Sequence, residues 1–375
     1  MKTKLFFAII LSSFCLTRCQ TDPAVSGGKT GIPPTPYTLI FPPDGMKPVP
    51  FPENPITIEG VYLGKKLFYD VRLSENNTQS CGSCHQPDFG FTDKGLAFSK
   101  GIDGIVGNRN SMPIFNLAWE KSFFWDGRSP DLEHQSLQPI QNPIEMHSTL
   151  PKVIQKLQVD PEYGSLFEKA FGSNEITSQR IAYAISQFER TIISFQSPFD
   201  KRFPKTTDVT RFLLRIAQDT SFKPKDDVER GMLIFFSDTR PNSGHCWHCH
   251  GNGPANNLYT DRMFHNNGLP ILGNDTGRMA VTGNPADFAY FKTPSLRNLA
   301  FTAPYMHDGR FKSIEEVIEH YTQGVVFPPQ VTKDANLARD FGKPLNLNIQ
   351  DKKDLKAFLL SLTDSVWYKN SAYRP

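Results

Sequence analysis

Cys81-Gly82-Ser83-Cys84-His85 is the stretch around which the rest of the sequence is organised. Two cysteines separated by two residues and followed at once by histidine are typical of covalent attachment of a c-type haem. Each thiol can add to one vinyl group of the porphyrin, and the adjacent histidine can donate an axial nitrogen to the iron. A second match, Cys246-Trp247-His248-Cys249-His250, uses the other cysteines beyond the first twenty residues. We therefore expect two covalently bound haems, with His85 and His250 as the proximal iron ligands.

Length and composition agree with a globular protein that encloses two such groups. The 375 residues suit two domains of ordinary size, one for each haem. The sequence contains 30 Phe, which fits apolar walls around flat cofactors, although core packing alone would also explain it. The formal net charge is +3, and no basic stripe stands out. We therefore predict no nucleic-acid partner.

The N-terminus resembles an export signal. Lys2 and Lys4 precede an apolar run from Leu5 to Leu11, which is too short to span a bilayer. The segment Leu16-Thr17-Arg18-Cys19 resembles a lipoprotein cleavage site, so a lipid anchor on Cys19 and plain cleavage nearby remain alternatives. Since bacteria attach c-type haem outside the cytoplasm, we expect a protein of the periplasm or cell envelope.

Most of the remaining chain carries apolar residues at helical spacing, and strand signals are weak. The segments with this pattern are residues 58–69, 131–138, 150–158, 163–171, 177–195, 226–236, 313–321 and 349–362. Loops rich in glycine or proline separate them and can wrap a cofactor. The pattern predicts an all-α fold of two cytochrome c-like haem domains with long cofactor-wrapping loops.

A division into four parts follows from this pattern. We expect a signal peptide (1–19), an extended tether or strap (20–55), an N-terminal haem domain (56–200) and a C-terminal haem domain (201–375). The boundary falls in residues 196–225, which we expect to form an irregular connection. One predicted helix precedes each haem motif at a similar distance, which suggests a duplicated domain.

Several separated motifs make the sequence resemble the bacterial dihaem cytochrome c peroxidase family, which includes the MauG-type enzymes. Over about residues 55–365 they occur in the order that the family has. They are the two haem motifs, Arg109-Asn110, Phe124 to Arg128, Gln135, Pro139 to Met146 and Thr293 to Gly309. The resemblance implies that the N-terminal haem is the site for hydrogen peroxide. It also implies that the C-terminal haem receives electrons from a small donor protein, a cytochrome c or a cupredoxin, and it suggests a homodimer.

The resemblance assigns roles to three residues of the N-terminal half. Glu145 matches the catalytic glutamate, and a carboxylate near the iron can shuttle a proton between the two peroxide oxygens. Gln135 matches the glutamine of the peroxide pocket. Trp125 matches the tryptophan between the two haems, where it could relay electrons or simply be a buried core residue.

The resemblance also implies a calcium ion at the domain interface. The matching positions are Asn110, through its side chain, and Thr302 and Pro304, through their backbone carbonyls. Hard oxygen ligands of this kind suit calcium.

The sequence departs from classical members of the family in two ways. No histidine lies between Gln86 and Glu133, so the N-terminal iron should be open at rest. Tyr321 occupies the place of the methionine that is the sixth ligand of the C-terminal haem, as in MauG-type members. A phenolate would lower the haem potential. Tyr321 could instead be a core aromatic residue, with Met306 or His320 as a rival ligand.

We therefore expect an exported peroxidase that reduces hydrogen peroxide to water. A MauG-type oxidase that acts on a protein substrate is the first alternative. A non-enzymatic electron carrier is the second, and it would need both irons closed by a sixth ligand. We assign no role to His245, His248 and His265, and we expect His307 to pack near the interface or a propionate.

Overall fold

The fold is mostly helical in the parts of the computed structural model that are described, residues 33–40, 46–202, 209–251, 256–325, 327 and 341–375. The helices are α1 (Ile58–Phe68), α2 (Cys81–Cys84), α3 (Leu132–Gln141), α4 (Leu150–Gln158), α5 (Pro161–Phe171), α6 (Ser178–Thr191), α7 (Pro198–Arg202), α8 (Val209–Gln218), α9 (Asp227–Phe236), α10 (Trp247–His250), α11 (Met279–Thr282), α12 (Ile314–Thr322) and α13 (Ile349–Ser361). Two short strands, β1 (Phe264–His265) and β2 (Phe291–Lys292), pair antiparallel. The predicted signal peptide, Cys19 and part of the predicted tether lie outside the described residues.

Among the described residues, seven single turns of 3₁₀-helix lie in the loops and in the segment after α13. They are η1 (Val71–Leu73), η2 (Pro87–Phe89), η3 (Leu117–Trp119), η4 (Asn256–Leu258), η5 (Pro285–Asp287), η6 (Trp367–Lys369) and η7 (Ser371–Tyr373). Within the described ranges, no helix is both long enough and apolar enough to cross a membrane.

The helices with strong apolar periodicity lie where the sequence predicts them, but three details differ. The expected irregular connection contains α7 and α8, and α8 packs Leu213 and Ala217 into a buried cluster. Helix α3 continues through Pro139 to Gln141, where a loop was expected. Helix α6 ends at Thr191 instead of running to Phe195.

Hydrogen bonds from Asn116, which is distant in sequence but adjacent in space, end α6 early. Its backbone N–H donates to the carbonyl of Ile192 (2.7 Å). Its side chain accepts from the N–H of Ser194 (2.8 Å) and donates to the carbonyl of Ser194 (3.1 Å). These bonds hold the chain extended after α6, because they occupy the backbone groups that a continued helix would use.

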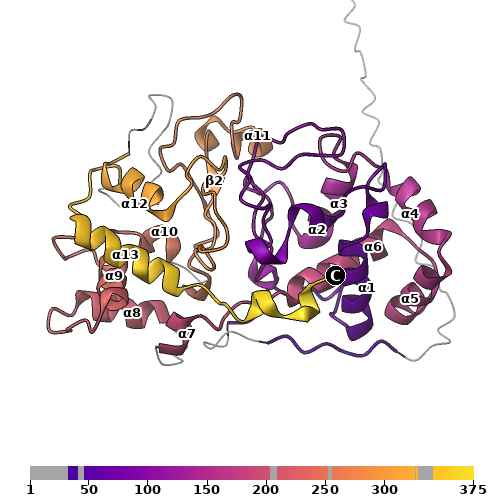
Figure 1. The fold of residues 1–375 in the computed structure, drawn as a ribbon, viewed down its shortest axis with the longest axis horizontal. Coiled ribbons are helices and arrows are strands. Elements are labelled where there is room, and N and C mark those ends of the chain that lie inside the picture. The colour runs from indigo at the N-terminus through magenta and orange to yellow at the C-terminus, as the bar shows by residue number, and fades with distance from the viewer. Residues whose placement is uncertain (1–32, 41–45, 203–208, 252–255, 326, 328–340) are drawn as a thin grey trace, which may run out of the picture.

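Two halves, each with its own apolar core, lie side by side (Figure 1). In the first half α1 packs against α6, and in the second half α9 packs against α13. Glycine makes both approaches close. A Cβ on Gly64 would lie 1.8 Å from the carbonyl oxygen of Ala184, and a Cβ on Gly231 would lie 1.9 Å from that of Asp354.

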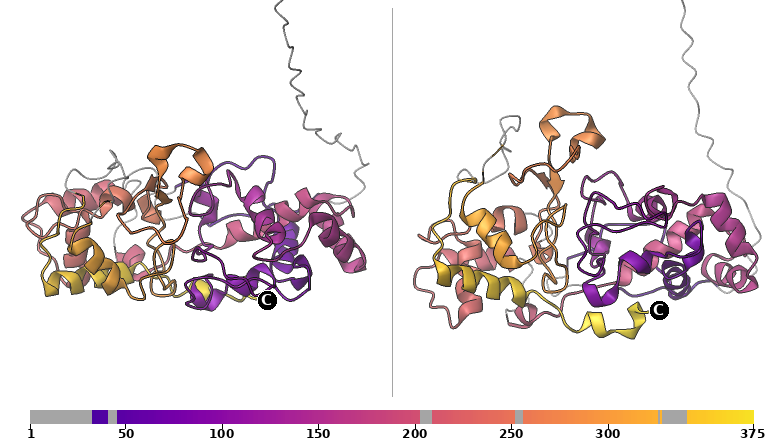
Figure 2. Two further views of the ribbon diagram at one scale, coloured as in Figure 1. Left: turned by 90° about the horizontal axis from the view of Figure 1, so that it is seen from above. Right: turned by 45° about the horizontal axis from the view of Figure 1, so that its top comes forward.

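The C-terminal segment leaves the second half and packs on the first (Figure 1), as the two views of Figure 2 also show. Trp367 is buried in the first core, where it stacks on Phe91 with ring centroids 5.5 Å apart. The hydroxyl of Tyr373 donates to the carbonyl of Thr191 (2.9 Å), and Arg374 pairs with Asp88. The first half is therefore completed by the last residues of the chain.

Candidate haem sites

The first haem motif forms the short helix α2 and the residue that follows it. The backbone N–H of Ser80 donates to the hydroxyl of Ser83 (3.0 Å), which closes the turn. The Nδ1 atom of His85 lies 2.8 Å from the carbonyl oxygen of Phe91. A carbonyl only accepts, so Nδ1 carries the hydrogen and Nε2 keeps the lone pair that an iron would need. Burial lowers the pKa of His85, which favours the neutral ring.

The second motif repeats this arrangement around α10. The Nδ1 atom of His250 donates to the carbonyl oxygen of Tyr259 (3.0 Å), so its Nε2 is also the free nitrogen. Burial lowers the pKa of His250 as well. Within the described residues, Cys246 and Cys249 form no disulfide, and neither do Cys81 and Cys84. Both donor sets therefore fit a covalently attached haem.

A cavity of about 550 Å³ opens in front of the first motif. This volume lies within the range of cofactor pockets. The predicted site residues in its wall are Cys81, Cys84, His85, Asn110, Trp125, Gln135 and Glu145. His85 is the only histidine among the described residues that line it, and nearby His134 and His147 are exposed. The cavity thus brings together one iron-binding histidine and the three predicted catalytic residues.

Glu145 is held in a loop after α3. The side-chain amide of Asn142 donates to its Oε1 atom (2.6 Å), and its backbone carbonyl accepts from the N–H of Ile102 (3.0 Å). Gly101 allows this contact, because a Cβ there would lie 2.2 Å from the carbonyl oxygen of Ile144. Burial raises the pKa of Glu145, while the positive charge of Arg128 opposes the rise. Glu145 is therefore a carboxyl group that can hold a proton more readily than an exposed glutamate does.

Trp125 lies where the two halves meet. Its indole N–H donates to the carbonyl of Asn110 (2.9 Å), and its own carbonyl accepts from the N–H of Lys292 in the second half (2.7 Å). Its ring centroid lies 6.5 Å from that of His307, which stacks on Phe291 at 3.6 Å. Burial lowers the pKa of His307 to about 4. His307 is thus a neutral packing residue at the interface.

The three predicted calcium ligands lie on segments that are close together. The backbone N–H of Asn110 donates to the carbonyl of His307 (2.7 Å), and its side-chain amide donates to the carbonyl of Leu96 (3.0 Å). Thr302 is close to the same loop, because a Cβ on Gly90 would lie 2.6 Å from its methyl group. Pro304 follows two residues later, and the calcium site itself stays a prediction.

The three candidate sixth ligands of the second haem meet around Asn267. Its side-chain amide donates to the sulfur of Met306 (3.4 Å), and its carbonyl accepts from Nε2 of His320 (3.2 Å). Tyr321 also bonds the Asn267 side chain, and burial together with the thiols of the second motif raises its pKa. All three candidates thus lie around one residue, and the identity of the sixth ligand stays a prediction.

Sequence reasoning missed two of these positions. Asn142 holds Glu145, and the signal for it was an Asn-Pro pair three residues before a glutamate, which favours a turn. Asn267 lies in an Asn-Asn-Gly loop that resembles any other turn. Its partners are distant in sequence, so no local pattern could have found it.

Two haem motifs on a mostly helical chain, each with its histidine in the iron-binding tautomer, define a dihaem c-type cytochrome. The family model for di-haem cytochrome c peroxidase matches residues 58–208. MauG, a methylamine utilization protein of Methylorubrum extorquens, is 37% identical over 318 residues, which cover 84% of this chain and 81% of MauG. The cytochrome c551 peroxidase of Nitrosomonas europaea is 36% identical over 313 residues, with coverage of 83% and 81%.

A comparison with solved structures agrees with these sequence similarities. A crystal structure of a MauG-like protein associated with microbial copper homeostasis superposes with a TM-score of 0.71 at 31% identity, over 87% of this chain and 95% of that protein. The chain therefore belongs to the di-haem cytochrome c peroxidase family, whose di-haem character implies two haem c groups.

Proposed function

We propose that the protein is an exported peroxidase that reduces hydrogen peroxide to water with electrons from a small donor cytochrome or cupredoxin. The observation that carries this proposal is the wall of the first cavity. Glu145 and Gln135 line it together with His85, and no second histidine does so among its described residues. A carboxyl group and an open iron face are what peroxide cleavage needs.

When bound, the first haem supplies the iron at which peroxide is reduced. Glu145 takes a proton from one peroxide oxygen and returns it to the other, so that the departing oxygen leaves as water. Asn142 holds Oε1 of the carboxyl group, which fixes its orientation for this transfer. Gln135 offers an amide that can orient peroxide by hydrogen bonding.

Each peroxide consumes two electrons and two protons and yields two waters. In this proposal the electrons enter through the second half, near His250. Trp125 touches both the first cavity and the second half, so its indole is placed to pass electrons across the interface. The proposal also includes export, with either a lipid anchor on Cys19 or plain cleavage nearby, a homodimer, and calcium bound by Asn110, Thr302 and Pro304.

A MauG-type oxidase that acts on a protein substrate is the second candidate. The position of Tyr321 beside Asn267 and the second motif favours it, because a phenolate ligand stabilises oxidised iron. The chain is also similar to a protein named for methylamine utilization. Turnover with a donor cytochrome distinguishes the two candidates.

The decisive experiment uses the haem-loaded protein and Glu145→Gln. The variant should keep both haems and lose about 10²- to 10⁴-fold in peroxide turnover. Glu168→Gln, an exposed glutamate on α5, is the matched control and should retain the wild-type rate. An unchanged rate in Glu145→Gln would remove Glu145 from the mechanism.

Electron paramagnetic resonance tests the open iron directly. The oxidised protein should show one high-spin and one low-spin haem, and peroxide should convert the high-spin signal. Two low-spin signals would show that the first iron has a second ligand at rest. The choice would then fall between an enzyme that needs reductive activation and an electron carrier.

A further inference from the structure

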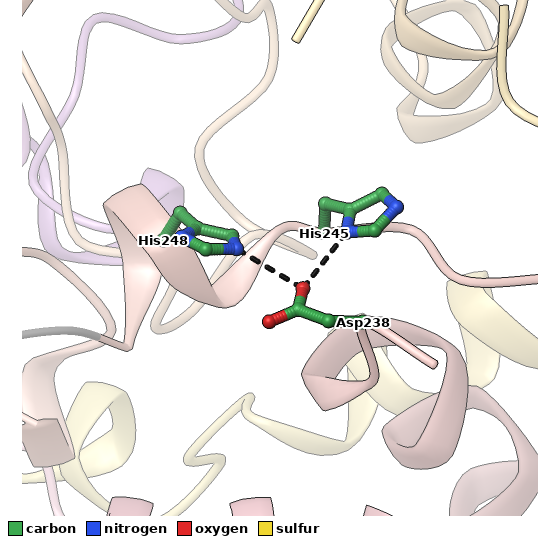
Figure 3. Close-up of side chains that lie close together, drawn as sticks. All are labelled: Asp238, His245 and His248. Atoms are coloured by element: carbon green, nitrogen blue, oxygen red, sulfur yellow. Dashed lines mark hydrogen bonds and ion pairs between the residues drawn. The ribbon is translucent and has the colours of Figure 1, made fainter. Parts of the chain in front are cut away.

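Asp238, His245 and His248 form a cluster beside the second haem motif that the proposed peroxidase chemistry does not use. The Oδ1 atom of Asp238 lies 2.8 Å from Nδ1 of His245 and 3.0 Å from Nε2 of His248 (Figure 3). One potential ligand atom from each side chain lies within 4.8 Å of the other two. The side chains are 31%, 29% and 25% exposed, so an ion from solvent can reach them.

Local structure holds the three side chains in this position. Asp238 follows α9, where the hydroxyl of Ser237 accepts from the N–H groups of Thr239 and Arg240 and tightens the turn. His245 has a φ of 54°, a left-handed conformation that non-glycine residues seldom adopt. The surrounding structure must enforce this backbone conformation. In this conformation the Nδ1 atom of the His245 ring reaches the carboxylate of Asp238.

Trp247 fixes the second histidine. Its ring stacks on that of His248 with centroids 4.1 Å apart, and its indole N–H donates to Asp238 Oδ1 (3.0 Å). A single carboxylate oxygen therefore receives three donors. The two imidazoles are ordered around this oxygen before any ion binds, which reduces the cost of assembling a site.

Two imidazoles and one carboxylate are a ligand set for divalent transition metals. Metal–ligand bonds of about 2.0–2.1 Å place two ligands about 2.8–3.0 Å apart at the right angles of a tetragonal copper site and about 3.3 Å apart in a tetrahedral zinc site. The two nitrogen–oxygen separations, 2.8 and 3.0 Å, are hydrogen-bond lengths, so the side chains need to move only slightly to hold an ion in place of the hydrogens. A neutral imidazole can bind the ion through the nitrogen that now faces Asp238 and carry its hydrogen on the other nitrogen.

We propose that Asp238, His245 and His248 bind one divalent transition-metal ion, Cu²⁺ or Zn²⁺, at the surface beside the second haem. Copper should bind more tightly than zinc at the same ligands. The other described group of this kind, Cys249, Asp261 and His265, is a poorer candidate, because haem attachment consumes its thiol. This site is separate from the irons and from calcium, and it does not depend on the peroxidase proposal.

The test is metal binding to the untagged, haem-loaded protein. Equilibrium dialysis against Cu²⁺ should leave one copper per chain in addition to two irons, and the Cu²⁺ resonance should show coupling to two imidazole nitrogens. Zn²⁺ should remove the copper signal only in large excess, because copper binds more tightly at the same ligands. Asp238→Asn and His248→Gln should each weaken binding by more than about 100-fold, because even outer-shell partners cost about 10- to 100-fold.

His147→Gln is the matched control. His147 is exposed and lies 2.5 Å from Asp103, so it forms a histidine–carboxylate pair without a second imidazole. This variant should bind copper like the wild type. Asp238 lies outside the haem motif, so Asp238→Asn can test metal binding even if His248→Gln impairs haem attachment. No bound copper in the wild type, or equal binding in Asp238→Asn, would overturn the proposal.

Discussion

The two halves of the molecule share a scaffold and differ in the residues that surround their haem motifs. In each half, a glycine on the helix before the motif contacts a carbonyl on a later helix and the Cβ of a phenylalanine one turn further on. The first set is Gly64, Ala184 and Phe188, and the second is Gly231, Asp354 and Phe358. In each half the proximal histidine also donates Nδ1–H to a loop carbonyl.

The differences lie in the residues that face each haem motif, on loops and on helices α3 and α12. The first half places Glu145 and Gln135 in the wall of a cavity, whereas the second brings Tyr321, Met306 and His320 together around Asn267. An open iron can react with peroxide, and an iron with two protein ligands can only transfer electrons. The comparison teaches that the helix pair positions a haem and that the residues surrounding the motif decide what the haem does.

The largest expected effect is a loss of stability when the close helix contact of either half is disturbed. It tests whether both halves require this contact. Gly64→Ala and Gly231→Ala should each destabilise the protein by about 3 kcal/mol or more, because the new methyl group meets a backbone carbonyl. Thermal unfolding measures this. Gly164→Ala is the control, since its nearest neighbour would be 3.9 Å away, and it should be neutral or stabilising. Tolerance of Ala at only one of the two positions would break the equivalence of the halves.

The next effect concerns the second half alone. Tyr321→Phe should change the low-spin resonance of the second haem and raise its potential by on the order of 0.1 V, since axial ligands set haem potentials over about 0.8 V. The signal of the first haem should not change. Tyr305→Phe removes a hydroxyl that donates to Leu299 and should leave both haems as they are. An unaltered second haem in Tyr321→Phe would turn attention to Met306.

A buried glutamate in each half gives a further contrast. Glu189 lines the first cavity, its Oε2 atom has no hydrogen-bond partner in the described structure, and burial raises its pKa to about 8. In the second half, buried Glu229 pairs with Arg202 and accepts from the N–H of Lys225.

The raised pKa of Glu189 makes the folded state bind a proton more tightly than the unfolded state does. Stability should therefore fall as the pH rises from about 4.5 to 8 and level off above this range. One pKa unit corresponds to about 1.4 kcal/mol, so the wild type should lose about 2 kcal/mol between pH 5 and pH 6.5 relative to Glu189→Gln. Thermal unfolding at both pH values measures the difference. A wild-type dependence of stability on pH in Glu189→Gln would contradict the assignment to Glu189.

The smallest effect concerns the acid limb of the pH–rate profile, which is the fall of the turnover rate at low pH. The carboxylate form of Glu145 accepts the proton, so activity should fall as the pH drops through its raised pKa. Arg128→Gln removes a positive charge that lowers this pKa, and the limb should move up by less than about one pH unit. The rate at saturating peroxide measures this shift. Arg128→Lys keeps the charge and should keep the wild-type limb, and a shift to lower pH in Arg128→Gln would reverse the assignment.

The sequence predicted those parts of the fold that depend on neighbours along the chain. Helices such as α6 and α13 carry apolar residues at regular spacing, so their presence follows from the pattern. Helix α8 was missed, because the polar segments on either side of it suggested a connection. The end of α6 was missed because Asn116, far away in sequence, ends it.

The candidate sites also contain residues that the sequence predicted and residues that it could not predict. The haem motifs are local, and family resemblance supplied Glu145, Gln135 and Trp125, which the structure places in one cavity wall. Asn142 and Asn267 act through single hydrogen bonds that no periodicity records. Asp238, His245 and His248 are close in sequence, but only the turn after α9 shows that they converge.

The C-terminal segment has a consequence for the order in which the protein is made and folded. The carbonyl of Phe91 holds His85, and the ring of Phe91 is covered by Trp367. Tyr69 donates its hydroxyl hydrogen to the carbonyl of Tyr373, which lies 304 residues later. Because the chain is synthesised from the N-terminus to the C-terminus, both haem motifs exist before Trp367 and Tyr373 can pack on the first half. The contacts that cover the loop around Phe91 can therefore form only after the last residues of the chain have been synthesised.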